Sequence, residues 1–62
     1  EEKIIGFLNK IKEDHDEKKL LIPFTRQQIA DFTGLRVETV IRTLIRMSEQ
    51  EKVSIIDHKL YY

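Results

Sequence analysis

Two short segments with helical hydrophobic spacing are separated by only three residues, Thr33-Gly34-Leu35. The upstream segment opens with Thr25 and Gln28, the T-x-x-Q pattern of a capping box, in which each residue's side chain bonds the backbone of the other. Gly34 predicts the end of this helix, because glycine adopts the positive φ of a helix C-terminus without strain. Two helices joined by a turn this short pack at a steep angle, so the pattern predicts a helix-turn-helix.

The downstream helix is predicted to run from about Arg36 to Glu51. Apolar residues recur along it at i, i+4 and i+7, the spacing of a stripe that faces a core. The upstream helix is barely two turns long and has its own apolar side. The residues expected to face the core are Ile29, Ala30 and Phe32 in the first helix and Val40, Leu44 and Met47 in the second.

The N-terminal part of the chain predicts a further helix and a short strand. Apolar residues at helical spacing indicate a helix from Glu2 to about Asp14. The DHDEKK segment, residues 14–19, has no periodicity and is expected to be a loop. The LLIPF segment, residues 20–24, indicates a short strand at the edge of a sheet, because Pro23 has no N–H for a central ladder.

The C-terminal part of the chain predicts a hairpin. The β-prone runs Val53–Ile56 and Lys59–Tyr62 flank Asp57 and His58, a two-residue turn without the glycine that usually occupies it. The predicted fold is therefore mainly α with a small β-wing (α+β). It is a winged helix-turn-helix of three helices, a short strand and a C-terminal β-hairpin, in a single domain over residues 1–62.

The charges sum to zero, with eleven basic and eleven acidic residues. Nucleic-acid-binding domains usually carry a basic excess, so the total argues mildly against that class. The distribution is uneven, however, because residues 25–47 contain four arginines against two acidic residues, whereas residues 13–17 read EDHDE. The helix-turn-helix segment therefore has a modest basic excess, although a charged stretch is more often only a solvated surface.

Several classes of protein are disfavoured by composition. The chain has no cysteine, which excludes a disulfide framework and a thiolate metal site. No apolar run approaches the ~20 residues that cross a bilayer and no signal peptide is evident, so we expect a cytoplasmic protein without a membrane partner. The sequence contains no nucleophile–base pair, Gly-rich phosphate loop or metal-ligand spacing, so we expect neither an enzyme nor a bound metal. The first residue is not methionine, and we therefore expect a fragment of a longer protein.

Charged side chains lie at the start of the downstream helix, where a purely structural helix needs none. Glu38 and Arg42 are four residues apart and share one helix face. Arginine can donate two hydrogen bonds to guanine O6 and N7, and glutamate can accept one from cytosine N4. The pair therefore fits a surface that reads bases. The alternative is an exposed salt bridge between the two residues, which contributes ~0.3–0.5 kcal/mol to stability and has no further role.

The segment TRQQIADFTGLRVETVIRTLIRM closely resembles the DNA-binding motif of the Crp/Fnr family of bacterial transcription regulators. The family's motif reads approximately T-R-x-E/D-I-A-x-x-L-G-x-[ST]-x-E-T-V-[SG]-R-x-L. The flanking helix, strand and hairpin also fall where the family has them. The matching residues are Thr25, Arg26, Ile29, Ala30, Gly34, Glu38, Thr39, Val40, Arg42 and Leu44.

The resemblance implies a role for each matching polar residue. Glu38 and Arg42 would read the G·C pairs of a TGA-containing half-site in double-stranded DNA. Other residues would contact phosphates, which fix the register of a protein on DNA without reading its sequence. The phosphate-contacting residues would be Thr25, Arg26 and Thr39, together with His58 and Lys59 at the tip of the hairpin.

Five residues depart from the family's pattern. Gln28 replaces an acid at little cost, because glutamine also closes a capping box. Arg36 replaces the usual Ser or Thr cap, and a cation there opposes the helix dipole by up to ~1 kcal/mol. Either a DNA phosphate compensates the unfavourable charge of Arg36, or Arg36 is a surface residue that caps the helix poorly. Val37 and Ile41 either contact thymine methyl groups or are scattered surface apolar residues. Thr33 replaces leucine, which is expected to loosen the packing before the turn.

The resemblance also implies partners. The family's regulators are homodimers that bind palindromic DNA, and RNA polymerase is a further implied partner. The sensory β-barrel and the dimerisation helix of the family are not found in these residues, so the fragment is expected to be monomeric. No residue suggests a site for a cyclic nucleotide, haem or iron–sulfur cluster, so no cofactor is expected here. The competing hypothesis is a winged helix used only for protein–protein contact, which the zero net charge and the apolar Val37 and Ile41 favour.

Overall fold

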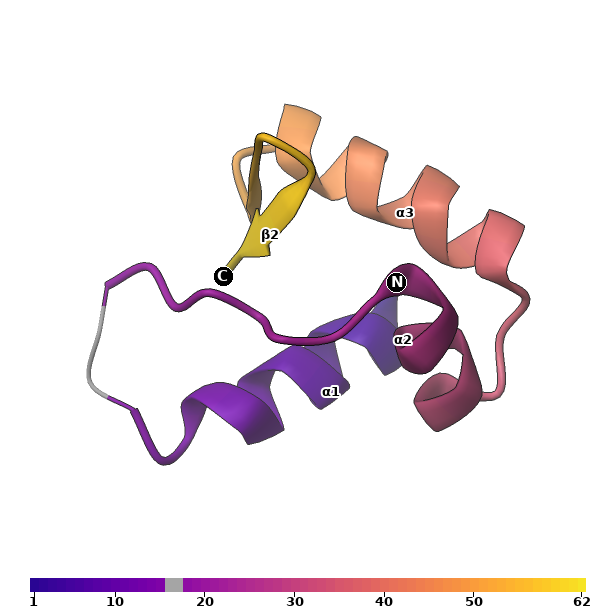
Figure 1. Cartoon of the computed structure of the whole chain (residues 1–62), viewed down its shortest axis with the longest axis horizontal. Helices are drawn as coiled ribbons and strands as arrows, with labels where there is room; N and C mark the ends of the chain where they lie inside the picture. Colours follow the sequence, from indigo (N-terminus) through magenta and orange to yellow (C-terminus); the bar gives the residue numbers. More distant parts are fainter. Residues whose placement is uncertain (16–17) are drawn as a thin grey trace.

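The computed structural model describes residues 1–15 and 18–62. The helix α2 packs against both α1 and α3, and the β1–β2 hairpin, called the wing below, packs beside α3 (Figure 1). This arrangement, mainly helical with a small antiparallel hairpin, confirms the predicted winged helix-turn-helix. The elements in chain order are α1 (Glu2–Lys12), α2 (Arg26–Thr33), α3 (Val37–Glu49), β1 (Ser54–Ile56) and β2 (Lys59–Tyr61).

α1 ends two residues earlier than predicted, at Lys12 rather than at Asp14. The N–H of His15 donates to the carbonyl O of Lys12 at 2.9 Å, a bond across three residues that tightens the chain into a turn. The predicted loop over residues 14–19 is confirmed where the structure describes it, and residues 16 and 17 lie outside the described residues. Within the described ranges, no helix is both long and apolar enough to cross a bilayer.

α2 has the predicted capping box and the predicted glycine end. The Thr25 N–H donates to Gln28 Oε1 at 2.8 Å, and the Gln28 N–H donates to Thr25 Oγ1 at 3.1 Å. At the other end, Gly34 has a φ of 74°, and its N–H donates to the carbonyl O of Ala30 at 2.9 Å. The Thr33 hydroxyl donates back to the carbonyl O of Ile29 at 2.7 Å, so this residue satisfies its polar group within the helix.

α3 begins at Val37, with Arg36 as its N-cap, and ends at Glu49. Arg36 has an extended backbone and makes no side-chain bond to the first turn, so the cap lacks the hydroxyl or carboxylate that usually accepts from an orphan N–H. The helix ends before the predicted Glu51, whose φ of 61° is left-handed and cannot continue a right-handed helix.

The wing closes through a two-residue turn without glycine. Asp57 and His58 have φ values of 50° and 64°, and positive φ at both positions is the mark of the type I′ turn that matches the strand twist. Asp and His are among the non-glycine residues enriched in this conformation. The predicted hairpin is confirmed, and its pairs are Ser54 with Tyr61, Ile55 with Leu60 and Ile56 with Lys59.

The LLIPF segment pairs with β2 over a shorter length than predicted. Leu20 and Tyr62 exchange two backbone hydrogen bonds of 2.9 Å, and the Ile22 N–H donates to the carbonyl O of Leu60 at 2.8 Å. The pairing amounts to a single bridge, between Leu21 and Tyr61, instead of a full strand. Pro23 follows immediately and has no N–H to extend the ladder.

Tyr62, the residue that follows β2, is bound to α1 by side-chain contacts. Lys12 Nζ donates to the carbonyl O of Tyr62 at 3.0 Å and lies 5.0 Å from the centre of the Tyr62 ring, a cation–π contact. The Tyr62 hydroxyl also donates to Asn9 Oδ1. These contacts, together with the pairing to residues 20–22, hold the wing in place beside the helices.

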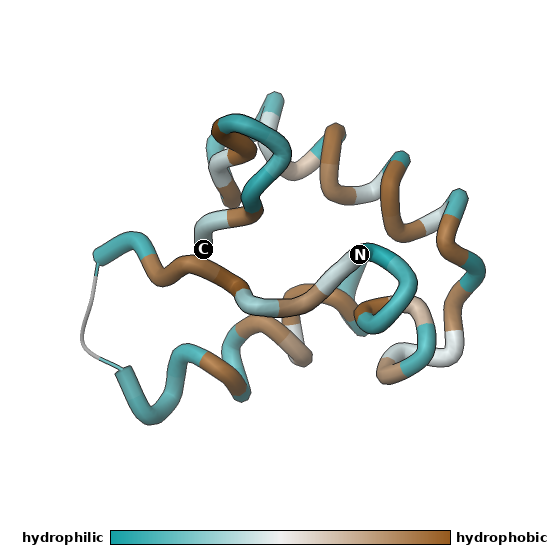
Figure 2. The backbone as a smooth tube through the Cα atoms, in the orientation of Figure 1, coloured by the Kyte–Doolittle hydropathy of each residue, from teal (hydrophilic) through white to brown (hydrophobic). Residues whose placement is uncertain are grey.

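The core is formed by apolar residues from the three helices, from β2 and from the segments that precede α2 and β1. Figure 2 shows that hydrophobic residues recur along α1 and α3, which is the pattern of helices with one buried side. The predicted stripes are confirmed except at Phe32, which is 66% exposed. Phe32 lies at the edge of the apolar stripe of α2, where its ring stacks on Phe7 and remains largely open to solvent. The buried residues are Ile4, Leu8, Ile22, Ile29, Ala30, Val40, Leu44, Met47, Val53 and Leu60.

Candidate nucleic-acid interface

The outer side of α3 carries the two residues predicted to read bases. Val40 and Leu44 face the core, so Glu38 and Arg42 lie on the exposed side of the helix. Within residues 1–15 and 18–62, the ion pair that forms joins Lys52 to Glu1, and none joins Glu38 to Arg42. The two side chains therefore remain available for contacts outside the chain.

The apolar residues of this helix face are not equivalent. Val37 is half-buried and packs against the core, because it lies one turn before the buried Val40. Ile41 is 43% exposed, and Ile45, one turn further on, is 50% exposed. Ile41 thus offers more free apolar surface than Val37. Ile45 is a further exposed apolar residue of this face, and its i+4 spacing from Ile41 and its place off the buried stripe are the sequence signals that indicate it.

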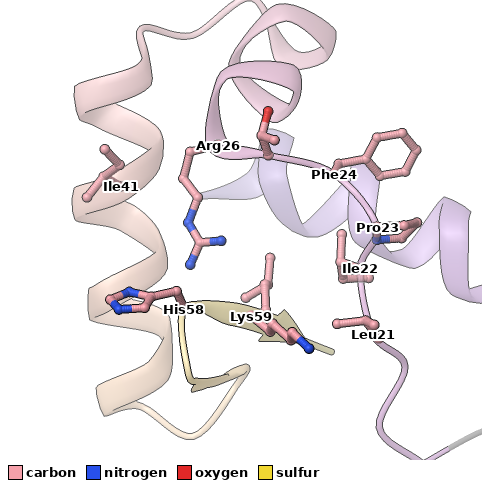
Figure 3. Close-up of a pocket in the computed structure, with 10 residues that line it drawn as sticks. Leu21, Ile22, Pro23, Phe24, Arg26, Ile41, His58 and Lys59 are labelled. Atoms are coloured by element: carbon pink, nitrogen blue, oxygen red, sulfur yellow. The ribbon is translucent and has the colours of Figure 1, made fainter.

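The start of α2, the middle of α3 and the tip of the wing surround a hollow, called the basic hollow below. Figure 3 shows the guanidinium of Arg26 directed into this space, with Ile41 on α3 and with His58 and Lys59 on the wing around it. Thr25 lines the same hollow. Five residues predicted from separate parts of the sequence are therefore neighbours in the fold.

Local structure explains how these side chains reach the basic hollow. Arg26 is the first residue of α2 and lies within the capping box, between Thr25 and Gln28, so its backbone is fixed. His58 and Lys59 are placed by the type I′ turn, which begins at Asp57. Among the described residues that line the hollow, none is acidic, and two are permanent cations. The electrostatics of the hollow therefore favour an anion such as a phosphate.

The floor of the basic hollow is apolar, a feature that the sequence did not predict. Leu21, Ile22, Pro23, Phe24 and Leu60 complete its lining. These residues come from the segment that pairs with β2 and from β2 itself. Their proximity to α3 depends on the pairing of residues 20–22 with β2, and the sequence indicated the strand-forming segments but not which of them pair.

The remaining predicted residues lie outside the basic hollow. Arg36 is exposed at the N-cap of α3, and Thr39 is exposed on its first turn. Together with Glu38 and Arg42, they form the free N-terminal part of α3. The predicted residues thus divide into two adjacent groups, one on α3 and one in the hollow, and Ile41 is shared by both surfaces.

Comparison with known proteins identifies the family. The family described as the Crp-like helix-turn-helix domain matches residues 2–61. Over 40 residues, the chain is 38% identical to the nitrogen fixation regulation protein FixK of Rhizobium meliloti (strain 1021). The match covers 64% of this chain but only 19% of that relative's length. No solved structure matches the chain.

The family match extends over almost every residue that builds the two surfaces. It includes the capping box, the glycine turn, α3 and the wing. The chain belongs to the Crp-like helix-turn-helix domain family, whose members are DNA-binding domains of transcription regulators.

Proposed function

We propose that this chain binds double-stranded DNA in a sequence-specific manner, with α3 in the major groove, as the DNA-binding domain of a transcription regulator. The observation that carries this proposal is the position of Ile41. Ile41 shares the exposed side of α3 with Arg42 and also lines the basic hollow with Arg26 and Lys59. A helix that enters the groove through this side brings cations to the neighbouring phosphates.

Base reading is assigned to the exposed side of α3. Arg42 donates two hydrogen bonds to a guanine, and Glu38 accepts one from the N4 amino group of a cytosine, which together fit a TGA-like half-site. Ile41 contacts a thymine methyl group. Val37 contributes less to such a contact, because most of its surface is already buried in the fold.

Phosphate binding is assigned to the residues around the helix. Phosphate contacts position a protein on the duplex and supply the salt-dependent part of its affinity. Two groups contribute, one in the basic hollow and one at the start of α3. They are Thr25, Arg26, His58 and Lys59 in the hollow, and Arg36 and Thr39 on α3.

The protein that contains this domain is proposed to act as a homodimer on a palindromic site. Two copies of a helix-turn-helix then read two half-sites separated by about one helical turn, ~34–36 Å. The chain matches a nitrogen fixation regulation protein along 19% of that protein's length. This match supports a regulatory role for the whole molecule. Contact with RNA polymerase is part of the same proposal.

A salt titration tests this function. The 62-residue chain is titrated into two labelled duplexes, one with a TGA half-site and one with the same bases scrambled, at several salt concentrations. We expect tighter binding to the TGA duplex and a slope of log K against log salt of about −3, since about three phosphates would be neutralised by Arg26, Arg36 and Lys59.

Two results would contradict the proposal at different levels. Equal affinity for the two duplexes, with the expected salt slope, would leave DNA binding intact and remove the TGA-like specificity. Absence of binding to either duplex would favour the competing function, a winged helix used for protein–protein contact.

A further inference from the structure

Three aromatic rings gather where α1 meets α2. The Phe7 and Phe32 rings are stacked, with centroids 5.2 Å apart and an interplanar angle of 22°. Phe24 meets both rings edge-on at 5.6 Å, and its side chain points away from Arg26 (Figure 3). The cluster is not closed on the outside, because Phe32 remains 66% exposed. Large aromatic residues that are exposed to water are typical anchors of protein interfaces.

The exposed side of this cluster is the floor of a groove between α1 and α2, called the α1–α2 groove below. Phe7, Ile11 and Phe32 form its apolar part, and Lys3 and Lys10 stand along α1 at its edge. The described residues that line this groove include no acid. Lys3 and Lys10 are exposed and are seven residues apart, which is two helical turns and about 10 Å along the axis. The groove is thus apolar within and positively charged along one edge.

Gly6 lies in the same groove without a structural need for glycine. It occupies the middle of α1, where glycine is less stable than alanine by roughly 0.5–1 kcal/mol. A Cβ atom built at this position would meet nothing within 4 Å, so no neighbour in the chain excludes a side chain. The absence of a side chain keeps the groove open beside Phe7 and allows another backbone to approach closely.

We propose that the α1–α2 groove binds an acidic amphipathic helix of a partner protein. The apolar side of that helix packs on Phe7 and Phe32, as in other grooves that hold a helix. A helix lying along α1 has the same rise per residue, so two of its carboxylates seven residues apart can pair with Lys3 and Lys10.

A second copy of this chain does not fit as the occupant. A two-fold contact through the groove would bring lysines against lysines, which is unfavourable. In the described helices, no two acidic residues are seven apart, since α1 and α2 each carry one and those of α3 are Glu38 and Glu49. The acidic helix is therefore not supplied by a second copy of these 62 residues.

The groove is separate from the proposed DNA surface. It shares no lining residue with the basic hollow. A partner can therefore occupy the groove while DNA occupies α3 and the wing. The inference does not depend on the proposed DNA sequence.

The test uses two synthetic helical peptides with the same apolar stripe. One peptide carries two glutamates seven residues apart beside the stripe, and the other carries lysines at those positions. Labelled peptides are titrated with the 62-residue chain, and binding is followed by fluorescence anisotropy. We expect the glutamate peptide to bind at least tenfold more tightly than the lysine peptide. Equal binding of the two peptides, or no binding of either, would overturn the proposal.

Charge reversal locates the binding site. The double variant Lys3→Glu/Lys10→Glu should prefer the lysine peptide, whereas Lys18→Glu/Lys19→Glu changes the net charge equally and should keep the original preference. Gly6→Leu should lower the affinity for the glutamate peptide at least tenfold while circular dichroism remains that of the parent chain. The proposal fails if the Lys18→Glu/Lys19→Glu variant reverses the preference as well, or if Gly6→Leu binds normally.

A further experiment tests whether the α1–α2 groove is separate from the proposed DNA surface. The glutamate peptide is added to the chain after the chain has bound a labelled duplex. A ternary complex is expected, and displacement of the duplex would place the peptide on the DNA surface and contradict the proposal. If the chain bound no DNA, the peptide titrations would still decide whether the groove holds a helix, so the two proposals fail separately.

Discussion

Arg36 occupies the N-cap of α3, a position where a cation is unfavourable for the helix. Its side chain makes no capping bond, and it is exposed at the end of α3 that is proposed to approach DNA. The same side chain thus weakens the isolated helix and supplies a positive charge to the interface. Stability and DNA affinity should therefore respond in opposite directions when Arg36 is replaced.

The substitution Arg36→Ser tests this opposition. Serine restores an acceptor for the first turn and removes the cation from the positive end of the helix, so we expect the free energy of unfolding to rise by roughly 0.5–1.5 kcal/mol. Affinity for any DNA sequence should fall, and the salt slope should become shallower by about one unit. Thermal melting and a salt titration measure the two effects. If DNA affinity were unchanged, Arg36 would be a poor cap with no role in binding.

The wing combines a strained backbone with two residues that are proposed to contact phosphate. Asp57 and His58 hold a left-handed conformation, and the turn directs His58 and Lys59 to the basic hollow. For a non-glycine residue, this conformation costs roughly 1 kcal/mol. A glycine at position 58 would relieve the strain but would remove the imidazole that the wing places beside the basic hollow (Figure 3).

Two variants at position 58 separate these effects. His58→Gly should raise the free energy of unfolding by up to about 1 kcal/mol, because the turn no longer strains the backbone. His58→Ala keeps the strain and should leave stability nearly unchanged. Both variants should weaken DNA binding by a similar factor, since both remove the imidazole. Equal affinity of both variants and the parent chain would show that His58 does not contact DNA.

The elements also show how far the sequence determined the fold. The bounds of α2 were predictable because Thr25, Gln28 and Gly34 are local signals that act within a few residues. Phe32 was misplaced because a helix of eight residues leaves the edge of its apolar stripe ambiguous. The common exposed side of Glu38 and Arg42 followed from their four-residue spacing, whereas their base-reading role came from the family resemblance and stays a prediction. The basic hollow did not follow from spacing, because it joins Arg26 to Lys59 through strand pairing that no local pattern encodes.

At the scale of the whole molecule, a single domain contacts one half-site, so its affinity for DNA should be modest. Two copies joined by a linker that spans one helical turn, ~34–36 Å, convert the second binding event into an intramolecular one. The affinity of this fusion for a palindromic TGA…TCA site should exceed that of the single chain by a factor on the order of 100 or more. A fusion that binds the palindrome no more tightly than one copy does would contradict the docking of α3 in successive major grooves.

The most direct test of whether α3 reads bases compares Arg42→Ala with Arg26→Ala. The affinity of each variant is measured on the TGA duplex and on the scrambled duplex at one salt concentration. Arg42→Ala should cost ~1–3 kcal/mol on the TGA duplex and leave binding to the scrambled duplex nearly unchanged, because Arg42 contacts a guanine. Arg26→Ala should weaken both duplexes equally, because Arg26 contacts phosphate. If Arg42→Ala lost the same factor on both duplexes, Arg42 would be a phosphate contact and base reading by this helix face would be contradicted.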